Sequence, residues 1–180
     1  MQGNVDAIYF NEKLYIGKRE EVFVYNESTG NFDLFYHLAG KNITLSCLHL
    51  DKNKNLWMGT TSNGIYCLSE DKSLSRPVTK GNITSIYEDS SNELWIGSWE
   101  EGLYRVKTDG NIENLRHNPM NTNSLCSNFV RSCCEDNSGD LWIGTFNGLN
   151  RYDRETGKFH LYTANGNSPD GLTHSCLLYT

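Results

Sequence analysis

The residues in this chain best suited to binding a small molecule stand at two recurring positions of a fourfold repeat. One position falls in a predicted turn and is occupied in the four copies by Arg19, Thr61, Trp99 and Phe146. The other begins a predicted strand and is occupied by Asp6, Ser46, Thr84 and Arg131. A Trp or Phe ring can stack on a sugar, and an Arg guanidinium can pair with the carboxylate or sulfate of an acidic glycan. The candidate binding residues are therefore Arg19, Thr61, Trp99, Phe146, Asp6 and Arg131.

The variation at these two positions has two interpretations. A single asymmetric ligand would require each copy of the repeat to present a different side chain. Residues on an unconstrained surface vary in the same way, and single exposed aromatic residues are common. The sequence leaves both interpretations open.

No motif in the chain is typical of an enzyme, a cofactor site or a metal site. The segment 136–140 resembles a calcium loop but lacks the ligand series and the distal Glu of an EF-hand, so we expect a turn there. The His residues fall at different repeat positions, and only Glu100 and Glu101 place two carboxylates together in a candidate turn. We therefore expect no catalytic residue, no cofactor and no metal.

The six cysteines show neither a disulfide framework nor the spacing of metal ligands. Cys133 and Cys134 are adjacent and would point to opposite faces of a strand. Aligned on the repeats, Cys133 takes the position of Ile8, Leu48 and Ile86, where a thiol can act as a small apolar filler. We expect structural thiols.

A short block recurs four times and defines the repeat: Leu14-Tyr-Ile-Gly17, Leu56-Trp-Met-Gly59, Leu94-Trp-Ile-Gly97 and Leu141-Trp-Ile-Gly144. The copies follow one another after 42, 38 and 47 residues. Such a period is typical of one four-stranded propeller blade per repeat. The sequence therefore predicts an all-β propeller fold.

The third copy shows the expected blade most clearly, with strands at 83–89, 94–98, 103–107 and near 112–116. Glycines close the turn between the second and third strands, where a positive φ suits glycine: Gly64, Gly102 and Gly148. An Asn or Asp with a Gly four residues later marks the turn between the third and fourth strands, at 26–32 and 153–159. Each copy is therefore predicted to form a meander of four antiparallel strands.

The chain is expected to form one partial propeller domain, 1–180. We place its blades at about 5–38, 43–79, 82–117 and 129–163, and the first strand of a further blade at 172–180. Four blades and one strand would leave two blade faces uncovered, which favours an open arc or self-association over a closed four-bladed ring. We expect a fragment of a larger propeller.

The aromatic residues of the repeated blocks are expected to pack between blades, because the blocks are apolar on both faces of the strand. These residues are Tyr15, Trp57, Trp95 and Trp142.

Charge and hydropathy exclude several classes of partner. The net charge is −6, and no basic cluster suits a nucleic acid. No stretch approaches the roughly 20 apolar residues that cross a bilayer, and no signal peptide opens the chain. We expect neither nucleic-acid binding nor membrane contact by this segment.

Residues 135–153, Glu-Asp-Asn-Ser-Gly-Asp-Leu-Trp-Ile-Gly-Thr-Phe-Asn-Gly-Leu-Asn-Arg-Tyr-Asp, closely resemble the two-component regulator propeller repeat. The linker 117–131 is similar to the long connection that this family places before an inner strand. The resemblance covers about residues 5–175. It implies an extracytoplasmic, periplasmic sensor propeller of a hybrid histidine kinase of the Bacteroidetes type, which would bind an oligosaccharide and sit beside the remaining blades of a parent sensor.

The resemblance implies sensing of a glycan-derived signal rather than catalysis, and two alternatives stay open. A propeller lactonase or lyase would need polar side chains converging on the central channel, where the inner-strand position offers only Asp6 and Arg131 as ionisable residues. A truncated, non-functional remnant is the other alternative. The family pattern predicts another Leu-Trp-Ile-Gly block after Leu172, whereas the chain stops at Thr180.

Overall fold

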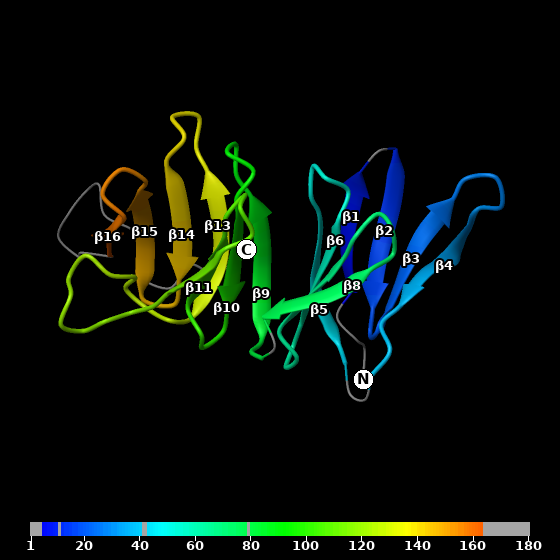
Figure 1. The fold of residues 1–180 in the computed structure, drawn as a ribbon, viewed down its shortest axis with the longest axis horizontal. Helices are drawn as coiled ribbons and strands as arrows, with labels where there is room; N and C mark the ends of the chain where they lie inside the picture. Colours follow the sequence, from blue (N-terminus) through cyan, green and yellow to red (C-terminus); the bar gives the residue numbers. More distant parts are fainter. Residues whose placement is uncertain (1–4, 11, 41–42, 79, 164–180) are drawn as a thin grey trace. The chain divides into compact units, whose positions relative to one another are not determined.

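The computed structural model of the chain describes residues 5–10, 12–40, 43–78 and 80–163. Within these ranges the regular secondary structure consists of β-strands alone, and the strands form four separate four-stranded sheets (Figure 1). Consecutive strands are hydrogen-bonded neighbours in each sheet, so each sheet is a meander built from one repeat. The expected all-β fold of propeller blades is confirmed. The strand expected at 172–180 lies outside the described residues.

The blades are numbered in chain order. Blade 1 contains β1 (Val5–Phe10), β2 (Lys13–Lys18), β3 (Glu21–Asn26) and β4 (Asn31–His37). Blade 2 contains β5 (Leu45–Leu50), β6 (Leu56–Thr60), β7 (Ile65–Leu68) and β8 (Leu74–Val78). Blade 3 contains β9 (Ile83–Glu88), β10 (Leu94–Ser98), β11 (Leu103–Val106) and β12 (Ile112–Leu115). Blade 4 contains β13 (Val130–Glu135), β14 (Leu141–Thr145), β15 (Gly148–Asp153) and β16 (Lys158–Tyr162).

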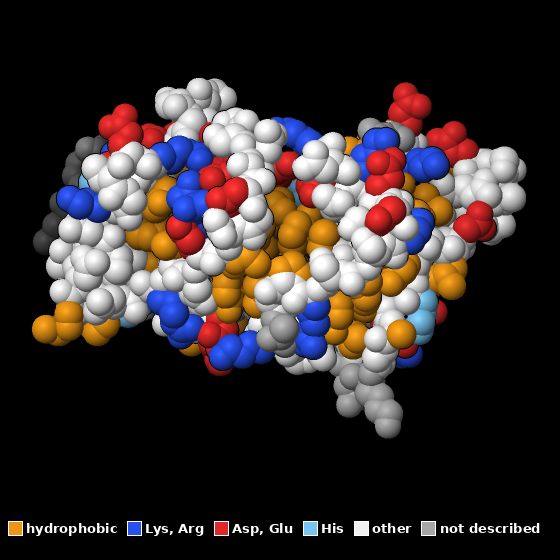
Figure 2. Space-filling model, in the orientation of Figure 1, with side chains coloured by type: hydrophobic (Ala, Val, Ile, Leu, Met, Phe, Trp, Pro, Cys, Tyr) orange, Lys and Arg blue, Asp and Glu red, His pale blue; other side chains and the backbone are white. Residues whose placement is uncertain are grey.

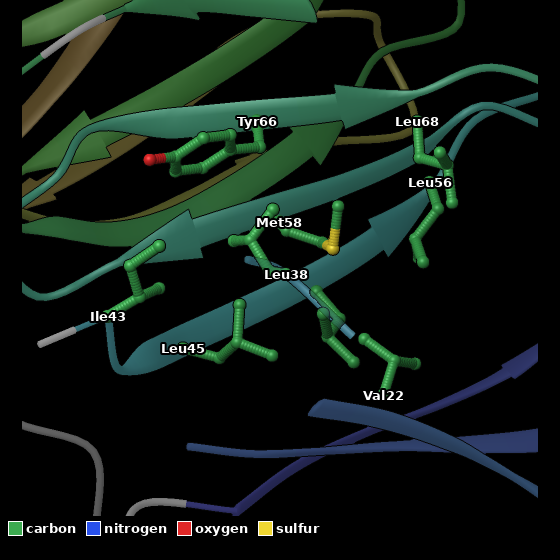
Figure 3. Packing of buried hydrophobic residues seen from close by; sticks show 9 residues of the cluster. Val22, Leu38, Ile43, Leu45, Leu56, Met58, Tyr66 and Leu68 are labelled. Atoms are coloured by element: carbon green, nitrogen blue, oxygen red, sulfur yellow. The ribbon is translucent and has the colours of Figure 1, made fainter. Parts of the chain in front are cut away.

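The chain divides into two compact units, Met1–Ile83 and Thr84–Thr180, each built around two blades. The core of the first unit lies between blades 1 and 2, where Met58 and Leu45 of blade 2 cluster with Val22 of blade 1 (Figure 3). Tyr15 packs against this core, as expected for its repeat position. Across the described residues, no helix is long and apolar enough to span a membrane.

The core of the second unit lies between blades 3 and 4. Trp95 of blade 3 is fully buried there and meets the ring of Tyr152 of blade 4 at 5.1 Å between centroids. Trp142 occupies the same repeat position in blade 4 and is only half-buried. The predicted packing role of the repeated tryptophan is therefore confirmed for Trp95.

The turn before each repeated Trp is held by an aspartate six residues earlier. Asp51, Asp89 and Asp136 each accept a hydrogen bond of 2.8 Å from the Nε1–H of their own Trp. Their other carboxylate oxygen accepts the backbone N–H four residues ahead. Asp136 therefore caps a hairpin turn, as expected from the missing EF-hand ligands.

In blades 1 and 3, glycine ends the repeated block where the next blade packs closely against it. A Cβ on Gly97 would lie 2.9 Å from Val130 Cγ1 of blade 4, and one on Gly17 would lie 3.1 Å from Leu48 Cδ1 of blade 2. The glycines predicted to close the second turn, Gly64, Gly102 and Gly148, all have positive φ.

The alignment of Cys133 with Ile8 is wrong by one residue. Cys133 pairs with Ile143 and Leu48 with Met58, whereas Ile16, the corresponding residue of β2, pairs with Ala7. Blade 1 has a shorter first turn, which shifts its register by one and places Ile8 on the opposite face. The five described cysteines are free, and burial raises the pKa of the Cys47 thiol to about 12.

Candidate functional site

Four side chains of the second unit form a continuous aromatic and cationic surface, which we call the rim cluster: Trp99, Phe129, Arg131 and Phe146. The rings of Trp99 and Phe129 meet edge to face at 5.5 Å, and those of Phe129 and Phe146 lie 6.2 Å apart. The Arg131 guanidinium lies 5.2 Å from the centroid of the Trp99 ring. Phe129 and Phe146 are 36% and 50% exposed, so solvent reaches the cluster.

Backbone hydrogen bonds hold the segments that carry these rings. Trp99 stands in the turn between β10 and β11, where the Ser98 hydroxyl donates to the Gly102 carbonyl and accepts the N–H of Glu101. The Gly102 N–H donates to the carbonyl of Asn128, next to Phe129. The Phe146 N–H donates to the Phe129 carbonyl at 3.0 Å. The backbone segments that carry the rings are therefore held together by the fold.

Arg131 reaches the Trp99 ring from an irregular point of β13. Val130 pairs with Thr145 and Ser132 with Gly144, so Arg131 is the extra residue of a β-bulge. A bulge re-aims a side chain out of the regular alternation of a strand. Among the described residues, Arg131 forms no ion pair with a carboxylate, and a cation–π contact leaves guanidinium N–H groups available to an anion.

Trp99, Arg131 and Phe146 were candidates from the sequence, and the structure brings them together. Phe129, the ring that joins them, was not a candidate, because it precedes the aligned inner strand. The sequence did offer one signal for Phe129: it directly precedes Val130, the first residue of the inner strand.

The other three candidates belong to the first unit and are engaged in backbone contacts. The Asp6 carboxylate accepts the N–H of Leu48 in blade 2 at 2.7 Å and that of Ala7 at 3.0 Å. The Arg19 carbonyl accepts the Leu45 N–H, and the Thr61 N–H donates to the Thr44 carbonyl. No described hydrogen bond or ion pair joins these three residues to one another.

The residues aligned with Asp6 in blades 2 and 3 also make structural contacts. The Ser46 hydroxyl donates to the Ile83 carbonyl at 2.6 Å, and the Thr84 hydroxyl donates to the Val130 carbonyl at 2.7 Å. Three of the four residues at this position therefore contact backbone groups, and only Arg131 is directed at a neighbouring aromatic ring.

The rim also carries acidic residues, and the carboxylate of one of them is paired. Glu101 forms an ion pair with Arg116, whose guanidinium also donates to the Glu100 carbonyl at 3.2 Å. Within the described ranges, no group of His, Cys, Asp and Glu could hold a metal ion. Figure 2 shows hydrophobic side chains reaching the surface between charged ones.

Three segments of the chain match the family model of the two-component regulator propeller: residues 37–62, 77–100 and 124–147. Each match includes one repeated Leu-Trp block. The third match also covers Phe129, Arg131 and Phe146 of the rim cluster. No sequence among the curated proteins matches the chain.

Solved structures with a similar fold include a lyase and extracellular domains of putative one- and two-component systems. A catalytically inactive variant of virginiamycin B lyase from Staphylococcus aureus, solved with quinupristin, has a TM-score of 0.71 and 16% identity over 93% of this chain. The extracellular domain of a putative one-component system from B. thetaiotaomicron has a TM-score of 0.66 and 17% identity over 94% of the chain. The extracellular domain of a putative hybrid two-component system from the same organism has a TM-score of 0.55 and 22% identity over 87%. The chain spans 57%, 30% and 27% of these three structures, respectively.

Proposed function

Because three segments of the chain match the family model of the two-component regulator propeller, we propose that it is a ligand-sensing segment of a two-component regulatory system. The observation that carries this proposal is the rim cluster, whose ring-bearing segments are held by backbone hydrogen bonds and in which Phe129 and Phe146 are exposed to solvent. Blade walls are used for packing, so a propeller binds through its turns and connections. We further propose that this segment acts outside the cytoplasm, in the periplasm, which accords with the extracellular domains of similar fold.

The proposed signal is a glycan fragment that carries a carboxylate or sulfate. Phe129 and Phe146 offer exposed ring faces for stacking on a sugar, and Arg131 offers donors to an anion. The proposal is binding rather than catalysis, because Asp6 is engaged with two backbone N–H groups and Glu101 with Arg116. The fold shared with a lyase makes a test for turnover necessary.

Titration of the purified chain with matched neutral, uronate and sulfated oligosaccharides tests this proposal by calorimetry. We expect an acidic oligosaccharide to bind, Phe146→Ala to weaken binding at least about tenfold, and Arg131→Gln to remove the preference for the charged sugar. Met120→Ala is the control, because Met120 is 92% exposed and belongs to no part of the rim cluster.

Two results would contradict the proposal. Equal binding by the wild type and by Phe146→Ala would move the site away from the rim cluster. Turnover of a lactone or uronide that Asp6→Ala abolishes would favour the enzyme interpretation instead.

A further inference from the structure

The contact between blades 3 and 4 shows which two surfaces fit together in this repeat. Trp95 and Arg105, paired across β10 and β11, cover Tyr152 and Phe159, paired across β15 and β16. The Arg105 guanidinium donates to the Tyr152 hydroxyl at 3.2 Å and lies over the rings of Trp95 and Tyr152. Tyr152 and Phe159 are 4% and 5% exposed in this contact. One surface carries a Trp and an Arg, and the other carries two stacked aromatic rings.

Blade 1 carries a second copy of the two-ring surface. The aromatic of the repeated block pairs with Val24 in blade 1 and with Arg151 in blade 4. Tyr25 and Tyr152 each follow that partner by one residue. Tyr25 pairs with Phe32 of the outer strand, as Tyr152 pairs with Phe159. The Tyr25 and Phe32 rings lie 5.3 Å apart, close to the 5.0 Å between Tyr152 and Phe159. Tyr25 and Phe32 are nevertheless 37% and 43% exposed.

The face of blade 1 around these rings is apolar over all four strands. Tyr9, Ile16, Phe23 and Leu34 project from the same face as Tyr25, since they alternate with the residues that pack on blade 2. Tyr9 is 74% and Leu34 56% exposed. Exposed apolar area of this kind is a typical feature of an interaction surface.

Blade 4 carries a second copy of the Trp and Arg surface. Trp142 pairs with Arg151 across β14 and β15, as Trp95 pairs with Arg105. Arg151 forms an ion pair with Asp140, and Arg105 forms one with Glu93 at the same repeat position. Trp142 is half-buried where Trp95 is fully buried, and Arg151 Nε has no hydrogen-bond partner among the described residues.

We propose that the Tyr25–Phe32 face of blade 1 binds the Trp142–Arg151 face of blade 4 in a second copy of this chain. The contact would repeat the one between blades 3 and 4, with Trp142 over Tyr25 and Arg151 near its hydroxyl. The two faces differ, so the association is heterologous, with each copy able to present one face to each neighbour.

One charge in the proposed contact differs from its template. Arg154 of blade 4 pairs with Asp89 of blade 3 at 2.7 Å, whereas the residue at the position of Arg154 in blade 1 is Glu27. Glu27 would face Asp136 of the second copy, the counterpart of Asp89. Like charges across an interface weaken it, so we expect Glu27→Arg to strengthen the association.

Sedimentation equilibrium over a range of protein concentrations tests the proposal. We expect the mass of the wild type to rise above that of the monomer, and Glu27→Arg to lower the dissociation constant about tenfold. Tyr25→Glu on the first face and Tyr162→Glu on the second should each leave a monomer, because both side chains are exposed and a buried charge disfavours the contact. Tyr162 lies on the same face of blade 4 as Trp142 and contacts its ring. Met120→Glu is the matched control and should associate as the wild type does.

Mixing the two monomeric variants distinguishes this contact from other kinds of self-association. Tyr25→Glu retains an intact blade 4 face and Tyr162→Glu an intact blade 1 face, so an equimolar mixture should restore a dimer. A wild type that stays monomeric at its highest soluble concentration would overturn the proposal and leave the two faces to blades of a longer polypeptide. A mixture that remains monomeric would overturn it as well. Neither result depends on ligand binding by the rim cluster.

Discussion

At the scale of single residues, each repeated Trp depends on an Asp six positions before it. Blade 1 lacks both partners: Tyr15 replaces the Trp, and its first turn is one residue shorter and contains no Asp. A buried indole N–H without an acceptor would be costly, whereas Tyr15 carries no indole N–H and is only partly buried. The joint absence of Trp and Asp in one blade indicates that the two residues act as a unit.

Replacing Trp95 with Ala is expected to lower the free energy of unfolding by about 3–5 kcal/mol, because a large, fully buried ring leaves a cavity. Trp142→Ala should cost clearly less in the monomer, since Trp142 is half-buried. Urea denaturation followed by circular dichroism measures both changes. Equal losses for the two variants would contradict the assigned difference in burial.

Asp89 is expected to make blade 3 less stable as the pH falls into the acid range. Burial disfavours its charged form, but hydrogen bonds from Trp95 and Arg154 outweigh burial and hold the pKa below its ordinary value of 3.8. A carboxyl whose pKa is lowered in the folded state stabilises that state above its ordinary pKa. That stabilisation should be lost as pH falls from about 5 through the lowered pKa. Asp89→Asn should be less stable at pH 7 and should lose less stability on acidification, which urea denaturation between pH 7 and pH 2 would measure.

At the scale of strands and blades, the block glycines Gly17 and Gly97 set how closely neighbouring blades approach. Gly97→Ala is expected to cost about 1–3 kcal/mol, because its Cβ would lie 2.5 Å from Ser85 Oγ and 2.9 Å from Val130 Cγ1. Gly17→Ala should cost less, since its nearest neighbour is the flexible end of Leu48 at 3.1 Å. In a double-mutant cycle, Val130→Ala should relieve part of the Gly97→Ala cost. Strictly additive effects would show that the two residues do not meet.

The sequence predicted the strands of blade 3 closely, because alternating apolar residues and turn residues mark them directly. It predicted β10 at its observed bounds and the other three strands to within one residue. It did not predict the β-bulge at Arg131, since a bulge leaves no local pattern and depends on pairing with β14. For the same reason the sequence identified three members of the rim cluster but not Phe129, which joins them only through long-range contacts.

At the scale of the whole molecule, stability is expected to be local, because each repeat buries its apolar surface against neighbouring repeats. The core between blades 1 and 2 and the core between blades 3 and 4 lie in different units of the chain. The four tryptophans are unevenly divided, with Trp57 in the first unit and Trp95, Trp99 and Trp142 in the second. Tryptophan fluorescence therefore reports mainly on the second unit, and a residue-level probe is needed to follow both.

Leu48→Ala, in the core of the first unit, is expected to cost about 2–5 kcal/mol because Leu48 is 4% exposed. Amide hydrogen exchange should become faster in β1–β8, while β13–β16 keep their protection, since local unfolding follows local contacts. Ile143→Ala, in the core between blades 3 and 4, is the reciprocal variant and should accelerate exchange in β9–β16 while β1–β8 keep their protection. If either substitution lowers protection equally in all four blades, the chain unfolds as one cooperative body, and its stability is not the sum of separate contacts between neighbouring blades.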